Sequence, residues 1–297
     1  MITRQREKAI QQLARAKLIE NDSMSLPVQP IHFARDKLGI TVQSFEPGVP
    51  DVSGFLMLSS GRFGIGYSTA ITNQGFQNFT VAHELGHYFI NGHCEALLSE
   101  GPHLSRSGFI SSDVYEREAD IFATEFLMPW KLISTLVDKT AHGFPAIAAI
   151  SRNCESSIVA SAIRYTAVAK DPVAVIVSNK ATIEFMTASQ DFCRIPGVDW
   201  LKRGQSLPVS VPSFSYGTRE DWIKKGALAE EGSLLSSWFS GTSNIEVEED
   251  IVGLGSYGRL LTVLIADCKL SEDDEEEETG TEYIDRWQKG LFRGKND

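Results

Sequence analysis

Three residues within one short stretch carry the clearest chemistry in the sequence. His83, Glu84 and His87 form the pattern HExxH inside residues 79–91, FTVAHELGHYFIN. In an α-helix, residues four apart lie on nearly the same face, so both imidazoles can bind one metal ion. Glu84 lies a quarter-turn round the helix, where its carboxylate can accept a proton from water held by the metal. The pattern is typical of zinc hydrolases, with two histidine ligands and a glutamate general base.

Apolar residues flank this motif on both sides of the predicted helix. Phe76, Phe79 and Ile90 share the histidine face, and Val81, Leu85 and Phe89 cover the opposite face. A helix that is apolar on both sides is predicted to be buried, and a buried helix holds ligands rigidly. The alternative is that the two histidines are satisfied core residues with a surface glutamate between them.

A second predicted helix, residues 114–130, offers the third ligand. Its buried stripe consists of Ala119, Phe122, Ala123, Phe126 and Leu127. Glu116 and Asp120 lie one turn apart along the margin of this stripe, whereas Glu118 and Glu125 point away from it. We therefore predict that Glu116 binds the metal and that Asp120 accepts a hydrogen bond from the free ring nitrogen of a ligand histidine. The alternative is an ordinary amphipathic helix with solvated acids.

The two motifs together resemble a known family. HELGH in the setting FTVAHELGHYF, followed by EREADIFATEFLMP, resembles the ImmA/IrrE family of bacterial and phage metallopeptidases, in its longer three-part form. The resemblance covers residues 79–129. It implies a zincin-like fold, Zn²⁺ bound by His83, His87 and Glu116, and Glu84 as the general base.

The same resemblance implies a substrate. Members of the family are expected to cleave a helix-turn-helix transcriptional repressor, which releases stress-response or mobile-element genes. Gln77 and Asn78 stand where many members carry arginine, which changes the local surface charge. A side chain that stabilises the charge on the carbonyl oxygen is also expected. The sequence leaves four candidates open for this role, which are His93, His103, Tyr115 and His142.

Composition and charge exclude some other classes of protein. The 297 residues carry a net charge of −11, of which ten acidic and four basic residues in 271–297 contribute −6. This balance disfavours tight nucleic-acid binding, which needs clustered Lys and Arg. Apolar runs are too short to span a bilayer, and four scattered cysteines without a CxxC pair are typical of a reducing compartment. We therefore expect a cytoplasmic protein without a membrane partner.

Local patterns predict the elements around the motif. Helices are expected at residues 2–20 and 28–38, strands at 40–45, 54–58 and 63–67, and a surface loop at 92–112. The strand at 63–67 immediately precedes the motif helix. It is therefore our candidate for the edge that pairs with an extended peptide.

Residues 147–166 resemble a helix-turn-helix, with a break near Asn153 and Cys154. Arg152, Arg164 and Lys170 are the cations that could contact DNA. Three scattered cations make a weak electrostatic footprint, so the sequence favours a structural or partner-docking role over direct DNA binding.

The chain from residue 172 is rich in predicted strands, at 173–179, 182–188, 207–214, 245–254 and 259–268. This succession of strands predicts a separate α+β domain, and the family resemblance implies a GAF-like sensor or docking domain. Its tryptophans are expected in the core. The whole chain is thus predicted to be an α+β protein with a metallopeptidase domain at 1–135, a helix-turn-helix-like segment at 136–170, a sensor or docking domain at 171–270 and an acidic tail at 271–297.

One further function remains open. A non-catalytic regulator that binds DNA or a protein partner could carry a purely structural zinc. Such a zinc would need a fourth protein ligand, for which Cys94 or His93 is the candidate.

Overall fold

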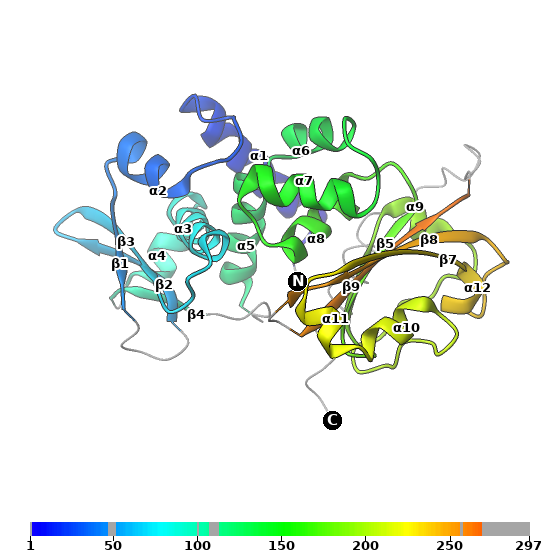
Figure 1. Ribbon diagram of the computed structural model, residues 1–297. Coiled ribbons are helices and arrows are strands. Elements are labelled where there is room, and N and C mark those ends of the chain that lie inside the picture. The colour runs from blue at the N-terminus through cyan, green and yellow to red at the C-terminus, as the bar shows by residue number, and fades with distance from the viewer. Residues whose placement is uncertain (1, 47–51, 100, 107–112, 256–257, 269–297) are drawn as a thin grey trace. The chain divides into compact units, whose positions relative to one another are not determined.

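A computed structural model describes residues 2–46, 52–99, 101–106, 113–255 and 258–268 (Figure 1). The chain divides into two compact units. The first comprises Met1–Ile133 and Ile150–Ser157, and the second comprises Ser134–Ala149 and Ile158–Asp297. The predicted acidic tail lies outside the described residues. Within the part that is described, every helix is too short or too polar to cross a membrane.

The first unit contains a four-stranded sheet with the order β1-β3-β2-β4. Its strands are β1 (Thr41–Phe45), β2 (Val52–Ser59), β3 (Arg62–Ser68) and β4 (His103–Arg106). β1 runs parallel to β3, whereas β2 is antiparallel to both β3 and β4. The strands expected at 40–45, 54–58 and 63–67 are therefore present, close to their predicted bounds.

The identity of the edge strand differs from our prediction. β3, expected at the edge, pairs with β1 on one side and β2 on the other. The edge near the motif helix is β4, within the stretch 92–112 that was predicted as loop. Its four residues are too few to show a strand period, and their pairing with β2 depends on a segment that lies about 50 positions away.

Helices pack beside this sheet in the first unit (Figure 1). They are α1 (Arg4–Glu20), α2 (Pro30–His32), the π-helical turn η1 (Phe33–Lys37), α3 (Gln74–Phe89), α4 (His93–Leu97) and α5 (Val114–Leu127). Side-chain caps fix where the two motif helices begin. Asn73 accepts a hydrogen bond from the backbone N–H of Phe76 in α3, and Asp113 accepts one from Tyr115 in α5.

The motif helices α3 and α5 approach each other at a glycine. A Cβ atom placed on Gly86 would lie 3.0 Å from the Ala119 Cα and 3.2 Å from its carbonyl oxygen. Phenylalanine side chains fill the space beside this contact, with Phe89 stacked on Phe122 and Phe122 stacked on Phe126. The close approach sets the spacing between the side chains that each helix presents to the other.

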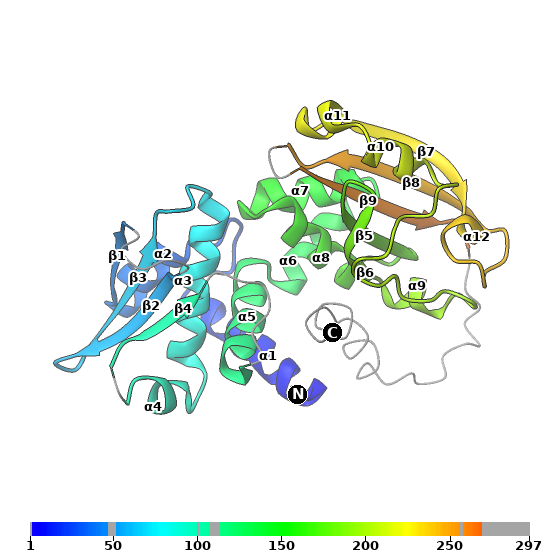
Figure 2. The same ribbon diagram turned by 90° about the horizontal axis from the view of Figure 1, so that it is seen from below.

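Helix α1 covers a second face of α5 (Figure 2). Two ion pairs cross this contact. An Nη atom of Arg6 lies 2.5 Å from a Glu118 carboxylate oxygen, and one of Arg15 lies 2.8 Å from Glu125. Glu118 and Glu125 are buried, which corrects the prediction that they point away from the packed face. The prediction failed because α5 is buried on two faces. The second face carries acidic side chains, whose charges are neutralised by the arginines of α1.

The second unit is built on a five-stranded sheet with the order β6-β5-β9-β8-β7, antiparallel throughout. Its strands are β5 (Val173–Asn179), β6 (Thr182–Ala188), β7 (Leu228–Leu234), β8 (Glu246–Gly253) and β9 (Arg259–Ala266). Besides the helices within residues 144–168, which are described below, its helical elements are α6 (Trp130–Val137, which begins in the first unit), α9 (Gln190–Arg194), α10 (Pro212–Gly217), α11 (Glu220–Lys224) and α12 (Leu235–Trp238). The central strands β5 and β9 are buried on both faces. The α+β class with a C-terminal antiparallel sheet is thus confirmed.

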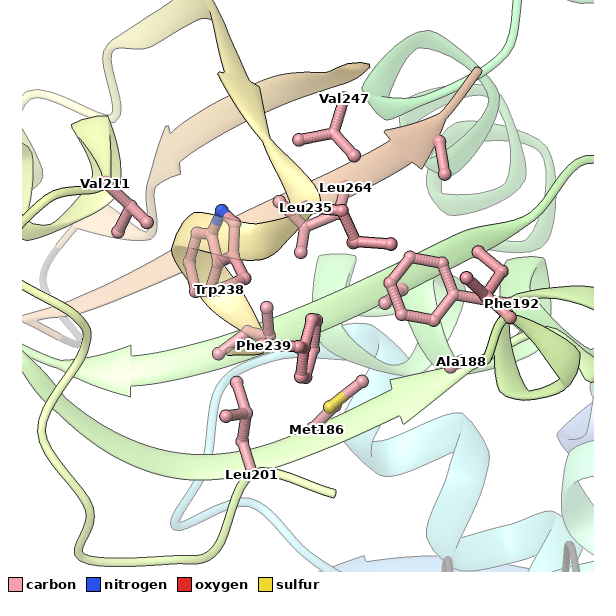
Figure 3. Close-up of a cluster of buried hydrophobic side chains, with 14 of the residues drawn as sticks. Met186, Ala188, Phe192, Leu201, Val211, Leu235, Trp238, Phe239, Val247 and Leu264 are labelled. Carbon is pink, nitrogen blue, oxygen red and sulfur yellow. The ribbon is translucent and has the colours of Figure 1, made fainter. Parts of the chain in front are cut away.

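One face of this sheet carries a large apolar core (Figure 3). Phe192, Trp238 and Phe239 are buried there against strand residues such as Met186. Trp200 packs on the same core, and with Trp238 it lines a cavity of about 410 Å³. The side chains of Trp200 and Trp238 therefore lie in or against the core, whereas Trp222 packs on a smaller buried cluster that contains Ile223 and Ile251. The sensor or docking role of the unit stays a prediction.

One strand prediction in this unit was wrong, and one strand was not predicted. Residues 207–214 were predicted as a strand, but 207–211 form a loop and 212–214 are the first residues of α10. Pro208 and Pro212 lack the N–H that a ladder needs, so this segment cannot pair along its length. β7, which was not predicted, is a mostly exposed edge strand that contains Glu230 and Glu231, and its sequence therefore lacks an apolar alternation.

The helix-turn-helix-like segment consists of α7 (Phe144–Cys154) and α8 (Ile158–Val168). Glu155 turns the chain between them with a φ of 52°. Of the three cations considered for DNA contact, Arg164 is buried and Lys170 forms an ion pair with Asp138 at 2.7 Å. Arg152 is exposed.

The α3–α5 contact leads to a prediction about Gly86. Helix propensity alone would make Gly86→Ala stabilising by about 0.5–1 kcal/mol. Because the added methyl group meets the α5 backbone, we expect the opposite sign, with the overlap costing about 1–3 kcal/mol. Chemical denaturation measures the change. Gly232→Ala is the control, because its methyl group meets no atom within 4 Å. A more stable Gly86→Ala protein would contradict the close approach.

Candidate metal centre

Helix α3 places two imidazoles side by side. The Nε2 atoms of His83 and His87 lie 3.0 Å apart, and both side chains are buried. The separation of four residues along the helix accounts for this arrangement, because it brings the two side chains onto one face. The pair therefore presents two nitrogen ligands to a common point.

Helix α5 brings one carboxylate to the same point. Glu116 Oε2 lies 3.4 Å from His83 Nε2, and Oε1 lies 3.3 Å from His87 Nε2. Ligand atoms placed tetrahedrally around zinc would be about 3.3–3.5 Å apart, given metal–ligand bonds of about 2.0–2.2 Å. The spacing of the three groups fits such an ion. Their role as ligands remains the prediction that this geometry supports.

The electrostatics of the group also favour a cation. Although burial opposes a charged ring, the Asp120 and Glu116 carboxylates raise the pKa of His83 to about 10. Burial lowers the pKa of the neighbouring His87 to about 3. Although burial raises it, hydrogen bonds from His103, His83 and His87 hold the pKa of Glu116 well below its usual range. The site therefore stabilises positive charge between the two helices, and a divalent ion can supply it.

Glu84, which the sequence predicts as the general base, is a buried residue of α3. Its side chain is fully buried, and neither carboxylate oxygen has a hydrogen-bond partner among the described residues. Burial raises the pKa of Glu84 to about 7, against the opposing charge of His83. The β2 backbone closes over it at Gly54, where a Cβ atom would lie 3.0 Å from Glu84 Oε1. A buried carboxylate without a protein partner is free to exchange a proton with water or substrate.

Asp120 lies beside the other nitrogen of His83. Its Oδ1 atom is 2.9 Å from His83 Nδ1. A proton on Nδ1 that is donated to this carboxylate leaves the Nε2 lone pair directed at the metal position. The structure thus places Asp120 beside His83, and its role in holding the His83 tautomer stays a prediction.

The four candidates for stabilising a carbonyl oxygen lie in different places. His103, on β4, has its Nε2 atom 2.8 Å from Glu116 Oε1. His93 is buried against His87, and Tyr115 packs edge-on against the His93 ring. His142 belongs to the second unit. Of the four candidates, His103 is thus the one that lies on the edge strand β4 and contacts the candidate ligand Glu116.

Sequence reasoning missed one buried partner of this site. Glu118 was set aside as an exposed acid, but it lies 3.1 Å from His93 Nε2. A signal was present in the sequence, because Glu118 and Glu125 are seven residues apart and share one face of a helix. Two acidic residues on one helix face indicate basic partners when another element covers that face, as α1 does here.

Comparisons with known proteins agree with the motifs. Residues 35–142 match the family model of M78 peptidases described as the IrrE N-terminal-like domain, which confirms the resemblance. No curated protein matches the chain. A Mycobacterium tuberculosis transcriptional regulator is similar in structure, with a TM-score of 0.50 and 13% sequence identity. The match covers 89% of this chain and 77% of that one, and at this identity it shows a shared fold alone.

The Asp120 contact leads to a prediction about metal binding. Asp120→Asn keeps the shape of the side chain but removes the charge that holds the His83 tautomer. Partners of this kind typically contribute 10–100-fold to metal affinity, so we expect Zn²⁺ binding to weaken by about that factor. Competition with a chromophoric chelator measures the change. Asp36→Asn, an exposed acid of the same unit, should leave the affinity unchanged. Equal losses in both variants would contradict the role of Asp120.

Proposed function

Because residues 35–142 form an IrrE N-terminal-like domain of the M78 peptidase family, we propose that this chain is a zinc-dependent endopeptidase. One observation carries the proposal. His83, His87 and Glu116 offer ligand atoms that all lie within 4.8 Å of one another, beside the buried and unpartnered carboxylate of Glu84. This combination supports a reaction in which one group binds a metal and another moves a proton.

The donor set supports zinc as the metal. Two imidazoles and one carboxylate are a common ligand set of catalytic zinc sites, which keep a fourth position open. Neutral imidazoles and one carboxylate would leave a divalent ion with one net positive charge. When bound, such an ion polarises a peptide carbonyl and makes water more acidic.

Glu84 provides the proton transfers in this proposal. Its carboxylate takes a proton from the water whose oxygen attacks the carbonyl carbon of the substrate. When the C–N bond breaks, the same carboxyl group returns that proton to the departing amine nitrogen. A pKa near 7 suits both steps, because the group can accept and release a proton at neutral pH. The burial of Glu84 keeps bulk water from competing for these transfers.

The edge strand β4 offers a way to hold the peptide. Among the described residues, β4 pairs with β2 alone, so its other edge is available for an added strand. His103 belongs to this strand and reaches Glu116. A substrate strand on β4 would bring a carbonyl oxygen near His103, which we propose as the side chain that stabilises its negative charge.

The proposed substrate is a helix-turn-helix transcriptional repressor. The M78 domain supports cleavage of a protein, and the family resemblance indicates this class of target. Loss of such a repressor would release stress-response or mobile-element genes. A narrow substrate range is expected, because a peptidase among cellular proteins must avoid indiscriminate cleavage.

A second candidate is a non-catalytic regulator of transcription with a structural metal. The structural similarity to a protein named as a transcriptional regulator favours it. A structural zinc needs a fourth protein ligand, yet the two candidates have other contacts. Cys94 directs its thiol to the His87 carbonyl oxygen, and His93 lies between His87 and Glu118. These contacts favour the catalytic function.

The role of Glu84 leads to the first functional prediction. Glu84→Gln removes the proton acceptor but no metal ligand. We expect it to retain stoichiometric Zn²⁺ and to lose about 10²–10⁴-fold in cleavage rate. The inactive variant can capture substrate from extracts of the native cell, and the captured proteins are then incubated with wild-type enzyme. Full activity of Glu84→Gln would remove the mechanism. A regulator without catalysis would instead bind DNA in a salt-dependent manner, whether or not Glu84 is changed.

Removal of a ligand should have a different effect. His87→Ala deletes one of two nitrogen ligands and leaves a cavity beside His83. We expect loss of both bound zinc and cleavage, measured by elemental analysis and by the assay on captured substrate. Unchanged metal content in this variant would show that the ion binds elsewhere.

A further inference from the structure

We infer that His93 is a positioning residue for the metal site, and that it connects His87 to helix α1 through Glu118 and Arg6. The inference rests on the metal site of the proposed function. It assigns a part in that site to residues outside the HExxH motif. Arg6 also lies outside the matched peptidase family region, which begins at residue 35.

The connection is a continuous series of hydrogen bonds. His87 Nδ1 lies 3.0 Å from His93 Nδ1, and His93 Nε2 lies 3.1 Å from Glu118 Oε2. Both oxygens of Glu118 are also bound by Arg6, with its Nε atom at 2.9 Å and its Nη2 atom at 2.5 Å. His87 is fully buried, His93 is 1% exposed and Glu118 is 6% exposed.

The direction of each hydrogen bond follows from metal binding. If Nε2 of His87 binds the metal, its proton is on Nδ1, and this proton is donated to His93. His93 must then accept through Nδ1 and carry its own proton on Nε2. That proton is donated to the Glu118 carboxylate, which Arg6 keeps ionised through paired hydrogen bonds. Each donor meets an acceptor, so the series selects the His87 tautomer that binds metal.

Local structure holds His93 in this position. Gly92, with a φ of 89°, turns the chain at the end of α3 and allows α4 to begin with His93. The Tyr115 ring of α5 packs edge-on against the His93 ring, with the two centroids 4.9 Å apart. Contacts from two further elements therefore fix the ring that orients His87.

A matched ion pair separates this role from simple packing. Arg15 and Glu125 join the same two helices, and Glu125 is as buried as Glu118. Glu125 also accepts a hydrogen bond from the backbone N–H of Trp130, at the C-terminal end of α5. Loss of Arg15 thus tests the helix contact alone, whereas loss of Arg6 tests the helix contact and the series that ends at His87.

The experiment measures Zn²⁺ affinity of the full chain by chelator competition and the visible absorption spectrum of the Co²⁺-loaded chain. His93→Leu removes both hydrogen bonds and should weaken Zn²⁺ binding about 10–100-fold and alter the Co²⁺ spectrum. His93→Asn keeps an acceptor near His87 Nδ1 and should recover part of the affinity. Arg6→Met should weaken binding by a smaller factor, and Arg15→Met should leave both readouts unchanged.

Two results would overturn the inference while the proposed function stands. One is wild-type Zn²⁺ affinity in His93→Leu and Arg6→Met, and the other is an equal loss in Arg6→Met and Arg15→Met. A wild-type chain that binds neither Zn²⁺ nor Co²⁺ would overturn the proposed function, and the inference with it. If His93→Leu does not fold, Glu118→Gln carries the same test, because it keeps the side-chain shape and removes the charge. Reduced affinity is expected, and unchanged affinity would again count against the inference.

Discussion

The site depends on the close contact between two helix backbones. Ligand atoms around one zinc ion must lie about 3.3–3.5 Å apart, and the candidate ligands here are side chains of α3 and α5. A side chain of limited reach such as Glu116 contacts the imidazoles only when the two helices lie close together. Gly86 lies between the two histidines in sequence and meets the α5 backbone at Ala119, so the residue without a side chain permits the distance. The distances between the candidate ligand atoms therefore depend on the backbone contact between Gly86 and Ala119.

A second constraint is the burial of charge. The first unit encloses three carboxylates, those of Glu84, Glu118 and Glu125, of which two have an arginine partner and one does not. Glu118 and Glu125 are neutralised by arginines of α1, which makes them structural. Glu84 has no such partner, and its pKa is raised. Two of the carboxylates are thus paired with arginines, and Glu84 is left able to change its protonation state.

The sequence allowed prediction of what local periodicity determines. His83, Glu84 and His87 lie on one helix, and the place of Glu116 and Asp120 follows from the period of the next one. Features that depend on distant pairing were not predictable in this way. The burial of Glu118 requires α1, more than 100 residues earlier, and the edge strand β4 is defined only by its pairing with β2. The metal, the repressor substrate and the domain boundaries stay predictions, and the acidic tail lies outside the described residues.

Helix α1 has a consequence for how the first unit can be isolated. A fragment cut at the start of the family match, residue 35, would retain every proposed ligand and the general base. It would also lose both arginines that neutralise the acidic face of α5. Uncompensated buried carboxylates cost about 3–5 kcal/mol when one partner of a pair is removed, which is a large fraction of a domain's stability. The smallest autonomous folding unit is therefore larger than the region that sequence matching outlines, and it includes the first helix.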